Sequence, residues 1–414
     1  MALENRIALK NAQKYNPVKI EEYLKIGGYE NVKKALKMDP VNIVDLVIDA
    51  KLRGRGGAGY SAGQKKRFTS EAICDRCIQK YIICNADEGE PGTFKDRIIL
   101  EQDPHVLIEG MIIAAHAIGA TKGFIYIRGE YTDSIHILRI AINQAKEKGF
   151  LGKNIFNSGF DLDIEIKLGA GSYLCGEELT LLESLEGKRG YPRIKPPFPA
   201  EKGLFGMPTL INNVETFAHV PYIIEHGADK YRSVGTPNSP GTKIFTISGD
   251  VVKPGYYETA LGLSLRDLIF DFAGGIKDGK KFKAAILGGA AGTFVDESVL
   301  DTQMGYDTLK EKGAVLGSGA IMVMSEERSI FDMTHSILKF FKHESCGKCV
   351  PCRVGTAQLM LMMDKVKNHP NGRKQLLNDM LLEAEYMAKT SLCPLGQSPI
   401  IPIRSLKQYF ENQF

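Results

Sequence analysis

The sequence predicts an α/β fold in which helices cover a parallel sheet. Three runs predict strands, at residues 80–85, 123–128 and 161–168. The first two are short and mostly apolar, and the third alternates polar and apolar residues in its first half before it opens into a glycine turn. Helical patterns at residues 104–118 and 134–149 separate these runs. Strands that alternate with helices of this length are typical of parallel sheets, so we expect ligands beyond the carboxyl ends of the strands.

The composition is that of an ordinary globular protein. The 414 residues are 43% hydrophobic and 25% charged, and this length predicts two or three domains. The net charge of +4 gives no reason to expect a nucleic acid or an anionic membrane as partner. No run approaches about 18 apolar residues and the start lacks the pattern of a signal peptide. We therefore expect a cytoplasmic chain without direct membrane insertion.

A glycine-rich turn at residues 53–60 organises the first half of the chain. Helical patterns precede it at residues 18–26, 29–37 and 40–50. Four glycines within six residues permit positive φ and a close approach of the backbone to a ligand. Together with the nearby arginine and lysine side chains, this predicts a site for the anion of a phosphate-bearing cofactor. A basic surface loop is the alternative.

An acidic segment at residues 85–97 follows the first predicted strand. Asp87, Glu88 and Glu90 place three carboxylates within four residues, at the carboxyl end of that strand. Polar groups in this position suit recognition of a ring system and of sugar hydroxyls. A solvated acidic turn is the alternative.

A second glycine turn, at residues 169–176, leads into a helix that ends near Leu185. Glu177 and Glu178 lie in its first turn, where acidic residues complement the helix dipole. As ligands, the same carboxylates would accept hydrogen bonds from ribose hydroxyls and repel a 2′-phosphate, which favours NAD over NADP.

A proline-rich segment at residues 195–200 holds Phe198 in a stiff, extended chain. Such a ring is a good surface for stacking a purine or a nicotinamide, and a plain rigid connector is the alternative. Residues 236–241 predict an interdomain linker.

The remainder predicts a small mixed domain followed by helices from Ser329 to the end. The expected strands and the one expected helix of the mixed domain are 242–249, 255–260, 264–272 (helix), 283–287 and 319–324.

Eight cysteines in a chain of this kind indicate metal or redox chemistry rather than disulfides. Cys346, Cys349 and Cys352 have the spacing Cys-x2-Cys-x2-Cys, and Cys393 follows, directly before a proline. This is the ligand pattern of a cubane iron–sulfur cluster. Zinc is its main rival, because four thiolates suit zinc as well.

The other cysteines are less informative. Cys74 and Cys77, with Cys84 after them, allow a second metal site, a redox-active pair or two cysteines in a loop. Without a fourth ligand we favour the loop. Cys175 is expected to be a packed thiol.

Together these stretches closely resemble the flavin-containing, NADH-binding subunit of respiratory complex I, known as the F type. They also resemble its homologues in NAD-dependent hydrogenases (the beta subunit) and formate dehydrogenases. The resemblance extends from about residue 40 to about residue 400. It rests on six motifs in the family's order: Gly-Arg-Gly-Gly-Ala-Gly at 54–59, Asn-Ala-Asp-Glu-Gly-Glu-Pro-Gly-Thr-Phe-Lys-Asp-Arg at 85–97, Cys-Gly-Glu-Glu at 175–178, Lys-Pro-Pro-Phe-Pro-Ala at 195–200, Asn-Asn-Val-Glu-Thr at 212–216 and Glu-Ser-Cys-Gly-Lys-Cys-Val-Pro-Cys-Arg at 344–353.

The resemblance implies three cofactor sites. The residues expected to bind FMN are Gly54, Arg55, Gly56, Lys65, Asn85, Asp87, Glu88, Gly176, Asn212, Asn213 and Thr216. The residues expected to bind NADH are Tyr60, Glu90, Tyr173, Glu178, Lys195 and Phe198. The ligands expected for a 4Fe-4S cluster are Cys346, Cys349, Cys352 and Cys393. Hydride transfer then takes place between cofactors, so no side chain is expected to be catalytic.

The resemblance also implies the fold and the setting. It implies a Rossmann-like domain for FMN and NADH at residues 1–235, a small ubiquitin-like (SLBB-type) α+β domain at 236–327 and a helical bundle with the cluster at 328–414. Expected partners are a small 2Fe-2S protein, the E-type subunit of such complexes, and a larger iron–sulfur or catalytic subunit. One departure is that Lys66 stands where the family commonly has a tryptophan.

The expected function is that of an NADH dehydrogenase subunit, in which FMN passes single electrons to the cluster and onward to partner subunits. One alternative keeps this chemistry but places it in the diaphorase module of a hydrogenase, bifurcating or not, or of a formate dehydrogenase. A different class of alternative is a scaffold that retains a structural zinc.

Overall fold

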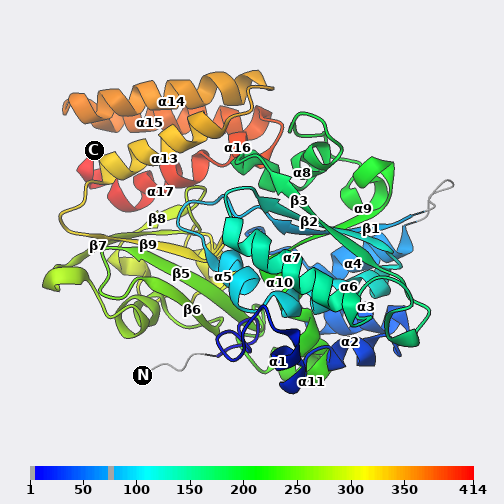
Figure 1. Cartoon of the computed structure of the whole chain (residues 1–414). Coiled ribbons are helices and arrows are strands. Elements are labelled where there is room, and N and C mark those ends of the chain that lie inside the picture. Colours follow the sequence, from blue (N-terminus) through cyan, green and yellow to red (C-terminus); the bar gives the residue numbers. More distant parts are fainter. Residues whose placement is uncertain (1–4, 73–78) are drawn as a thin grey trace.

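The computed structural model describes residues 5–72 and 79–414, in two sheets and a helical C-terminal region (Figure 1). Cys74 and Cys77 lie outside the described residues, so the interpretation of that pair as a loop stays a prediction. The result is a mixed α/β architecture, as the alternation of strands and helices predicts.

The first sheet has four parallel strands in the order β3-β2-β1-β4. Their bounds are β1 (Tyr81–Ala86), β2 (Lys122–Arg128), β3 (Asp163–Gly169) and β4 (Thr209–Asn213). The three predicted strands are confirmed, and β4 is an addition that the sequence analysis did not predict. The strand order reverses beside β1, which creates a topological switch point between β1 and β4. Open parallel sheets bind their ligands at such a point.

Helices cover both faces of this sheet. They are α1 (Ile20–Lys25), α2 (Glu30–Ala35), α3 (Pro40–Asp49), α4 (Ala62–Glu71), α5 (Lys95–Gln102), α6 (Pro104–Ile118), α7 (Thr132–Glu147), α8 (Glu178–Leu185), α9 (Pro199–Lys202), α10 (Val214–Ala218) and α11 (Val220–Arg232). Along β1, Ile82 and Cys84 point into the core that α6 fills, whereas Ile83 packs against the α8 side. This alternation explains why the run at β1 is apolar on both faces.

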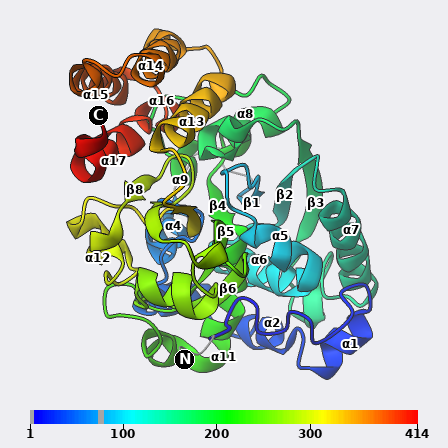
Figure 2. The same ribbon diagram turned by 90° about the vertical axis from the view of Figure 1, so that its left-hand side faces the viewer.

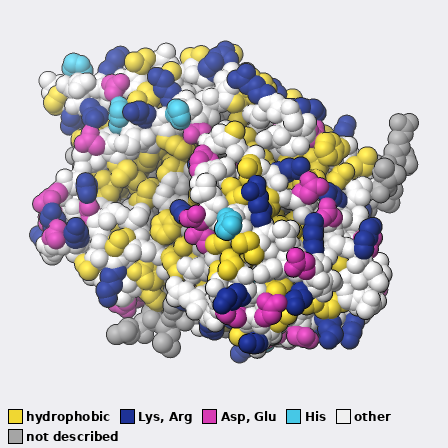
Figure 3. Space-filling model, viewed as in Figure 1, with side chains coloured by type: hydrophobic (Ala, Val, Ile, Leu, Met, Phe, Trp, Pro, Cys, Tyr) yellow, Lys and Arg dark blue, Asp and Glu magenta, His cyan; other side chains and the backbone are white. Residues whose placement is uncertain are grey.

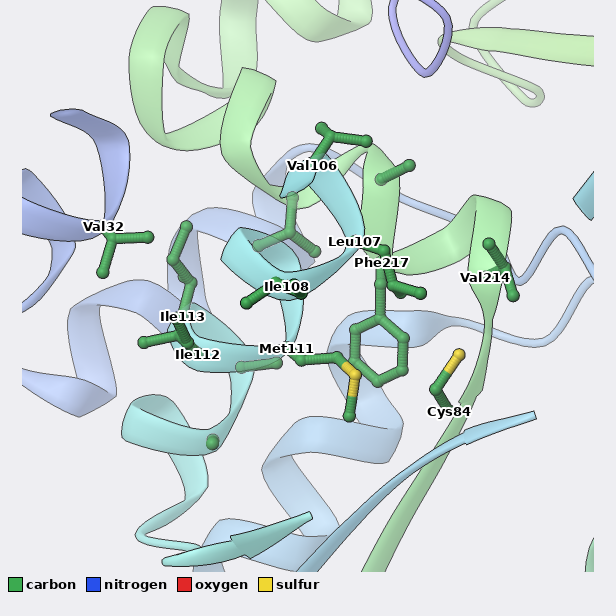
Figure 4. Packing of buried hydrophobic residues seen from close by; sticks show 14 of the residues in the cluster. Val32, Cys84, Val106, Leu107, Ile108, Met111, Ile112, Ile113, Val214 and Phe217 are labelled. Carbon is green, nitrogen blue, oxygen red and sulfur yellow. The ribbon is translucent and has the colours of Figure 1, made fainter. Parts of the chain in front are cut away.

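Helix α6 is the centre of the larger core. Every one of its residues except His116 is buried. Figure 4 shows Met111 of α6 beside Phe217 of α10, and Cys84 of β1 near the same ring. Gly110 allows this packing, because a Cβ at this position would lie 2.2 Å from the backbone oxygen of Phe217.

The second sheet is mixed, with the order β6-β5-β9-β7-β8. Its elements are β5 (Thr242–Gly249), β6 (Gly255–Ala260), a π-helix at Asp267–Phe272, β7 (Phe282–Leu287), β8 (Thr293–Val295), α12 (Tyr306–Glu311) and β9 (Ala320–Ser325). The four predicted strands are present, while the short β8 and α12 were not predicted. Strands β5 and β9 are parallel, and the other pairs are antiparallel.

The two sheets are joined by buried polar contacts. Glu258 of β6 accepts hydrogen bonds from the backbone N–H groups of Ile7, Ala8 and Leu9, at 2.8 to 2.9 Å. The predicted linker at residues 236–241 is packed at its C-terminal end rather than solvated, because Ser239 and Gly241 are buried against other residues of the protein. The N-terminal segment thus crosses from one sheet to the other.

The C-terminal helices are α13 (Ile330–Glu344), α14 (Val350–Asn368), α15 (Arg373–Thr390), α16 (Pro394–Gln397) and α17 (Ile400–Phe410). They lie at one end of the molecule, with α1 and α2 at the other (Figures 1 and 2). Ser405 of α17 accepts a hydrogen bond from the backbone N–H of Phe294 in β8, which fixes the bundle on the second sheet.

Charged side chains of both signs are spread over the face in Figure 3, with lysines and arginines along its upper edge near α14 and α15. Among the residues that the structure describes, no helix has the length and apolar content that crossing a membrane requires.

We predict that Gly110→Ala destabilises the protein by about 1–3 kcal/mol, because the new Cβ forces α6 away from α10. Urea unfolding of both proteins measures the difference. His136→Ala, at an exposed position of α7, is the control and should change the free energy of unfolding by less than about 0.5 kcal/mol. Equal stability of Gly110→Ala and the parent chain would show that α6 and α10 are not packed this closely.

Candidate functional site

The site lies at the switch point, where β1 and β4 end side by side. Cys84 pairs with Asn212 and Asn85 pairs with Asn213 in the register of these two strands. The Asn85 side chain donates to the backbone oxygen of Gly176 at 2.8 Å. The fold therefore brings together three segments that the sequence analysis predicted separately, at residues 85–88, 176 and 212–216.

Two of the predicted FMN ligands have polar atoms without a partner in the protein. Oδ2 of Asp87 and Nδ2 of Asn212 are both buried and make no hydrogen bond. Burial raises the pKa of Asp87 to about 7. A buried polar atom without a partner is costly, whereas a bound ligand with hydroxyl, carbonyl and N–H groups would satisfy both atoms. These residues fit FMN.

The glycine turn lies directly against this crevice. A Cβ at Gly56 would lie 3.0 Å from Cβ of Asn213, so only glycine allows the turn to come this close. The backbone N–H of Arg55 donates to Oγ1 of Thr216 at 2.9 Å. From the second sheet, the hydroxyl of Tyr306 donates to the backbone oxygen of Gly54 at 2.9 Å. Both halves of the molecule thus position the turn.

The Arg55 side chain has a different role from the one that its position in the turn suggested. It is fully buried, and its Nη2 donates to the hydroxyl of Tyr231 at 3.0 Å and to the backbone oxygen of Pro240 at 2.8 Å. The guanidinium is therefore not available to a phosphate, and the backbone N–H of Arg55 is already bonded to Thr216. The sequence gave no sign that the guanidinium of Arg55 binds the predicted linker at residues 236–241.

Glu88 also uses its carboxylate inside the protein. It accepts from the backbone N–H groups of Asp96 and Arg97, at 2.8 and 3.1 Å, and from the hydroxyl of Tyr131 at 3.2 Å. These bonds satisfy free N–H groups at the start of α5. What remains for a ligand is the backbone of Glu88 rather than its side chain.

A buried network of charges supports the end of β4, and the sequence analysis missed it. Nζ of Lys95 lies 2.6 Å from Asp96 and 3.1 Å from Glu215, and Nζ of Lys243 lies 2.5 Å from Glu215. Asn213 donates to Asp96 at 2.6 Å and accepts from Lys95 at 3.0 Å. Burial alone would raise the pKa of Glu215, but Lys243 and Lys95 outweigh it and lower that pKa to about 2.

The predicted nucleotide residues form a second group of charges. Glu178 contacts Nζ of Lys65 and Nζ of Lys195, each at 2.8 Å, and Lys195 also lies 3.0 Å from Glu177. Burial would raise the pKa of Glu178, but the two lysines lower it to about 2. Glu177 accepts from the backbone N–H groups that begin α8, whereas the partners of Glu178 are two lysine side chains, which can exchange this carboxylate for a ligand.

Exposed aromatic rings accompany these charges. Tyr60 and Phe198, both predicted to contact NADH, are each 52% exposed. Phe68 of α4 is equally exposed and was not predicted, although α4 packs against α9, which directly follows Phe198. A cavity of about 750 Å³ on the outer side of the glycine turn includes Tyr60 in its lining and none of the predicted FMN residues. The aromatic rings, rather than this cavity, mark the expected nucleotide surface.

Glu90 and Tyr173 connect the three parts of the molecule. The Tyr173 hydroxyl donates to Glu90 at 2.6 Å, and the backbone N–H of Ala291, in the turn between β7 and β8 of the second sheet, donates to Glu90 at 3.2 Å. The backbone N–H of Tyr173 donates to Glu344, the last residue of α13, at 3.0 Å. These two predicted nucleotide residues therefore connect directly to the segment that leads to Cys346.

The four cysteines gather where the C-terminal helices begin. Cys349 precedes the first residue of α14, Cys352 lies in its first turn, and Cys393 precedes α16. All four belong to one packed cluster of side chains, and Cys352 and Cys393 are buried. The described residues contain no group of three or more His, Cys, Asp or Glu side chains placed closely enough to hold a single metal ion. The donor set is four thiols, which suits a cubane cluster.

Two family models match the chain. One is the Nuo51 FMN-binding domain, over residues 47–222, and the other is the NADH-ubiquinone oxidoreductase-F iron-sulfur binding region, over residues 332–414. The F subunit of NADH-quinone oxidoreductase from Aquifex aeolicus (strain VF5) is 51% identical over 406 residues, which cover 98% of this chain and 93% of that protein. The chain belongs to the family of NADH-quinone oxidoreductase F subunits.

This family includes hydrogenase subunits. NADP-reducing hydrogenase subunit HndC of Solidesulfovibrio fructosivorans is 45% identical over 409 residues, or 99% of this chain and 82% of that protein. A chain of the NAD+-reducing NiFe hydrogenase in its H2-reduced state has the same fold, with a TM-score of 0.81 and 38% identity. That match covers 92% of this chain but only 62% of the hydrogenase chain.

Membership of this family confirms the predicted resemblance and the predicted cofactors. The chain contains an FMN-binding domain, and the region that carries the four cysteines is an iron–sulfur binding region rather than a zinc site. The alternative of a scaffold that holds only zinc is thereby excluded. The individual ligand residues stay predictions.

We predict that Glu215→Gln lowers the free energy of unfolding by about 3–5 kcal/mol at pH 7, because the buried ammonium groups of Lys95 and Lys243 both lose a carboxylate partner. The folded pKa of Glu215, about 2, lies below its ordinary value of 4.5. Its stabilisation is therefore complete above pH 4.5 and is lost as the pH falls towards 2. Urea unfolding of both proteins at pH 7 and again near pH 3 should show the difference shrinking, and a difference that grows towards low pH would contradict the ionised network.

Proposed function

We propose that the chain is the subunit of a larger complex in which FMN accepts hydride from NADH and a 4Fe-4S cluster takes the electrons onward one at a time. The chemistry belongs to these cofactors, so the residues of the chain bind, orient and separate them. The observation that carries the proposal is the crevice between β1 and β4, where Asp87 and Asn212 have buried polar atoms without partners.

Around this crevice, we assign FMN contacts to all the residues predicted from the sequence, with two refinements. Glu88 would contribute through its backbone, and Arg55 would exchange the bond of its backbone N–H to Thr216 for the ligand, because both side chains are bound within the protein. Lys65 would exchange its contact with Glu178 for the FMN phosphate, since it lies beside the glycine turn on α4.

NADH would lie across the exposed rings of Tyr60 and Phe198, with Phe68 as a third stacking surface. Glu178 and Lys195 would meet its ribose and phosphate groups, and Glu90 and Tyr173 would line the inner end of the pocket. The four cysteines would hold the cluster. We propose three domains to match these sites. They are a Rossmann-like domain for FMN and NADH at residues 1–235, an SLBB-type domain at 236–327 and a helical bundle that holds the cluster at 328–414.

The cluster must pass its electrons on, so we propose partners that carry further iron–sulfur clusters, among them a small 2Fe-2S protein of the E type. In this proposal the chain is cytoplasmic and reaches a membrane only through its partners. Two kinds of parent complex fit this proposal. The 51% identity to a subunit of NADH-quinone oxidoreductase favours a complex I, and the 45% identity to HndC favours a hydrogenase.

An absorbance spectrum of the anaerobically purified protein tests the proposal. Flavin bands on a broad iron–sulfur shoulder should be present, and NADH should bleach them. If the protein shows no flavin band and no bleaching even after reconstitution with FMN and iron, the proposed function is wrong.

The same assay tests nucleotide choice. We predict that Glu178→Gln raises the ratio of kcat/KM for NADPH to that for NADH about tenfold, or about 1.4 kcal/mol, because a 2′-phosphate no longer meets a carboxylate. Glu177→Gln is the matched control, since it removes the same charge one residue away but keeps an oxygen that caps α8. Equal ratios in both variants and the parent would exclude Glu178 as the selecting group.

A further inference from the structure

We infer that Ser345 sets the reduction potential of the iron–sulfur cluster by donating a hydrogen bond to the sulfur of Cys352. The two atoms, Oγ of Ser345 and Sγ of Cys352, lie 3.2 Å apart. Either atom could donate between a free hydroxyl and a free thiol. A cysteine that binds iron is a thiolate and has no proton, so in the loaded protein only the serine can donate.

The local backbone directs this hydroxyl. Ser345 is extended, with φ −64° and ψ 123°, and ends α13 immediately before Cys346. The backbone N–H of Gly347 donates to Oγ of Ser345 at 3.4 Å, which occupies a lone pair of that oxygen. The hydroxyl proton is then free to point towards Cys352. Glu344, the preceding residue, is fixed by its bond from Tyr173, so the serine is held from both sides.

Ser345 is also the donor that a side-chain substitution can remove. At Cys393 the donors are backbone N–H groups, those of Leu395 and Gly396, and they belong to the fold. A Cβ at Gly396 would lie 2.8 Å from Cβ of Cys352, so the turn after Cys393 packs directly on Cys352. Cys352 is therefore buried beneath this turn, and it meets a hydroxyl donor from Ser345.

A hydrogen bond to a cluster sulfur stabilises the reduced cluster more than the oxidised one, because the reduced cluster carries one more negative charge. Ser345 thus raises the reduction potential and makes the cluster a better acceptor for electrons that come from the flavin. It is a positioning residue that acts through Cys352. The inference rests on the proposed function, because it requires the cluster.

The test is a redox titration of the full chain, loaded with FMN and the cluster and followed by electron paramagnetic resonance. Ser345→Ala should shift the midpoint potential of the cluster to a more negative value at unchanged iron content. Ser345→Thr, which keeps the hydroxyl, should restore the parent value. Ser336→Ala is the control, because Ser336 is exposed on the same helix and bonds only the backbone oxygen of Asp332.

A second readout reports the proton itself. After exchange into D2O, the parent chain and Ser345→Thr should show a coupled deuteron near the cluster, and Ser345→Ala should lose that coupling. An unchanged potential in Ser345→Ala, or an equal shift in Ser345→Thr, would overturn the inference. So would a Ser345→Ala protein that cannot be loaded with iron while the threonine variant can, since the role would then be in assembly. Absence of iron from the reconstituted parent chain would instead refute the proposed function.

Discussion

The buried carboxylate of Glu215 is the interaction on which the arrangement of this molecule depends. It contacts Lys95 from the acidic segment and Lys243 from the second sheet, and it lies in the first turn of α10, directly after β4. Buried ion pairs are weak evidence for extra stability, because desolvation offsets much of their attraction. Their value here is geometric, since the network can form only when all three segments have the right relative position.

The position of the crevice between β1 and β4 follows from this network. Lys95 and Asp96 hold the Asn213 side chain, and Asn213 lies against Gly56 of the glycine turn. Asn212, next to it, keeps its amide free for a ligand. The same principle connects the predicted nucleotide residues with the segment that leads to Cys346, because Tyr173 bonds Glu90 on one side and Glu344 on the other. Parts that are remote in sequence are thus held together by short contacts.

The sequence predicted the elements whose signals are local. Strands β1 and β2 and helix α6 have apolar runs, β3 alternates polar and apolar residues, and the glycine turns and the cysteine spacing are visible without a fold. Strand β4 was missed because it has five residues and ends in two asparagines, so its identity comes from pairing with β1. Helix α4 was missed because its sequence is polar, and its burial depends on Gly63 packing against Ile48 of α3.

The contacts of buried charged side chains were beyond prediction for a similar reason. Arg55 and Lys95 look like ligands or surface charges in the sequence, since charged residues are seldom fully buried. Arg55 reaches Pro240, 185 residues along the chain, and Lys95 reaches Asn213, 118 residues along the chain. No local pattern encodes such partners. The classes of cofactor could be predicted from the sequence. Only the fold shows which residues can contact a ligand with their side chains and which of those side chains are already bound within the protein.

A density map of the FMN-loaded chain, from crystals or from electron cryo-microscopy, tests the central claim most directly. The account predicts the flavin between the ends of β1 and β4, with hydrogen bonds to Oδ2 of Asp87 and Nδ2 of Asn212 and with the glycine turn against its ribityl phosphate. A flavin bound elsewhere, or one that leaves both atoms without a partner, would contradict it.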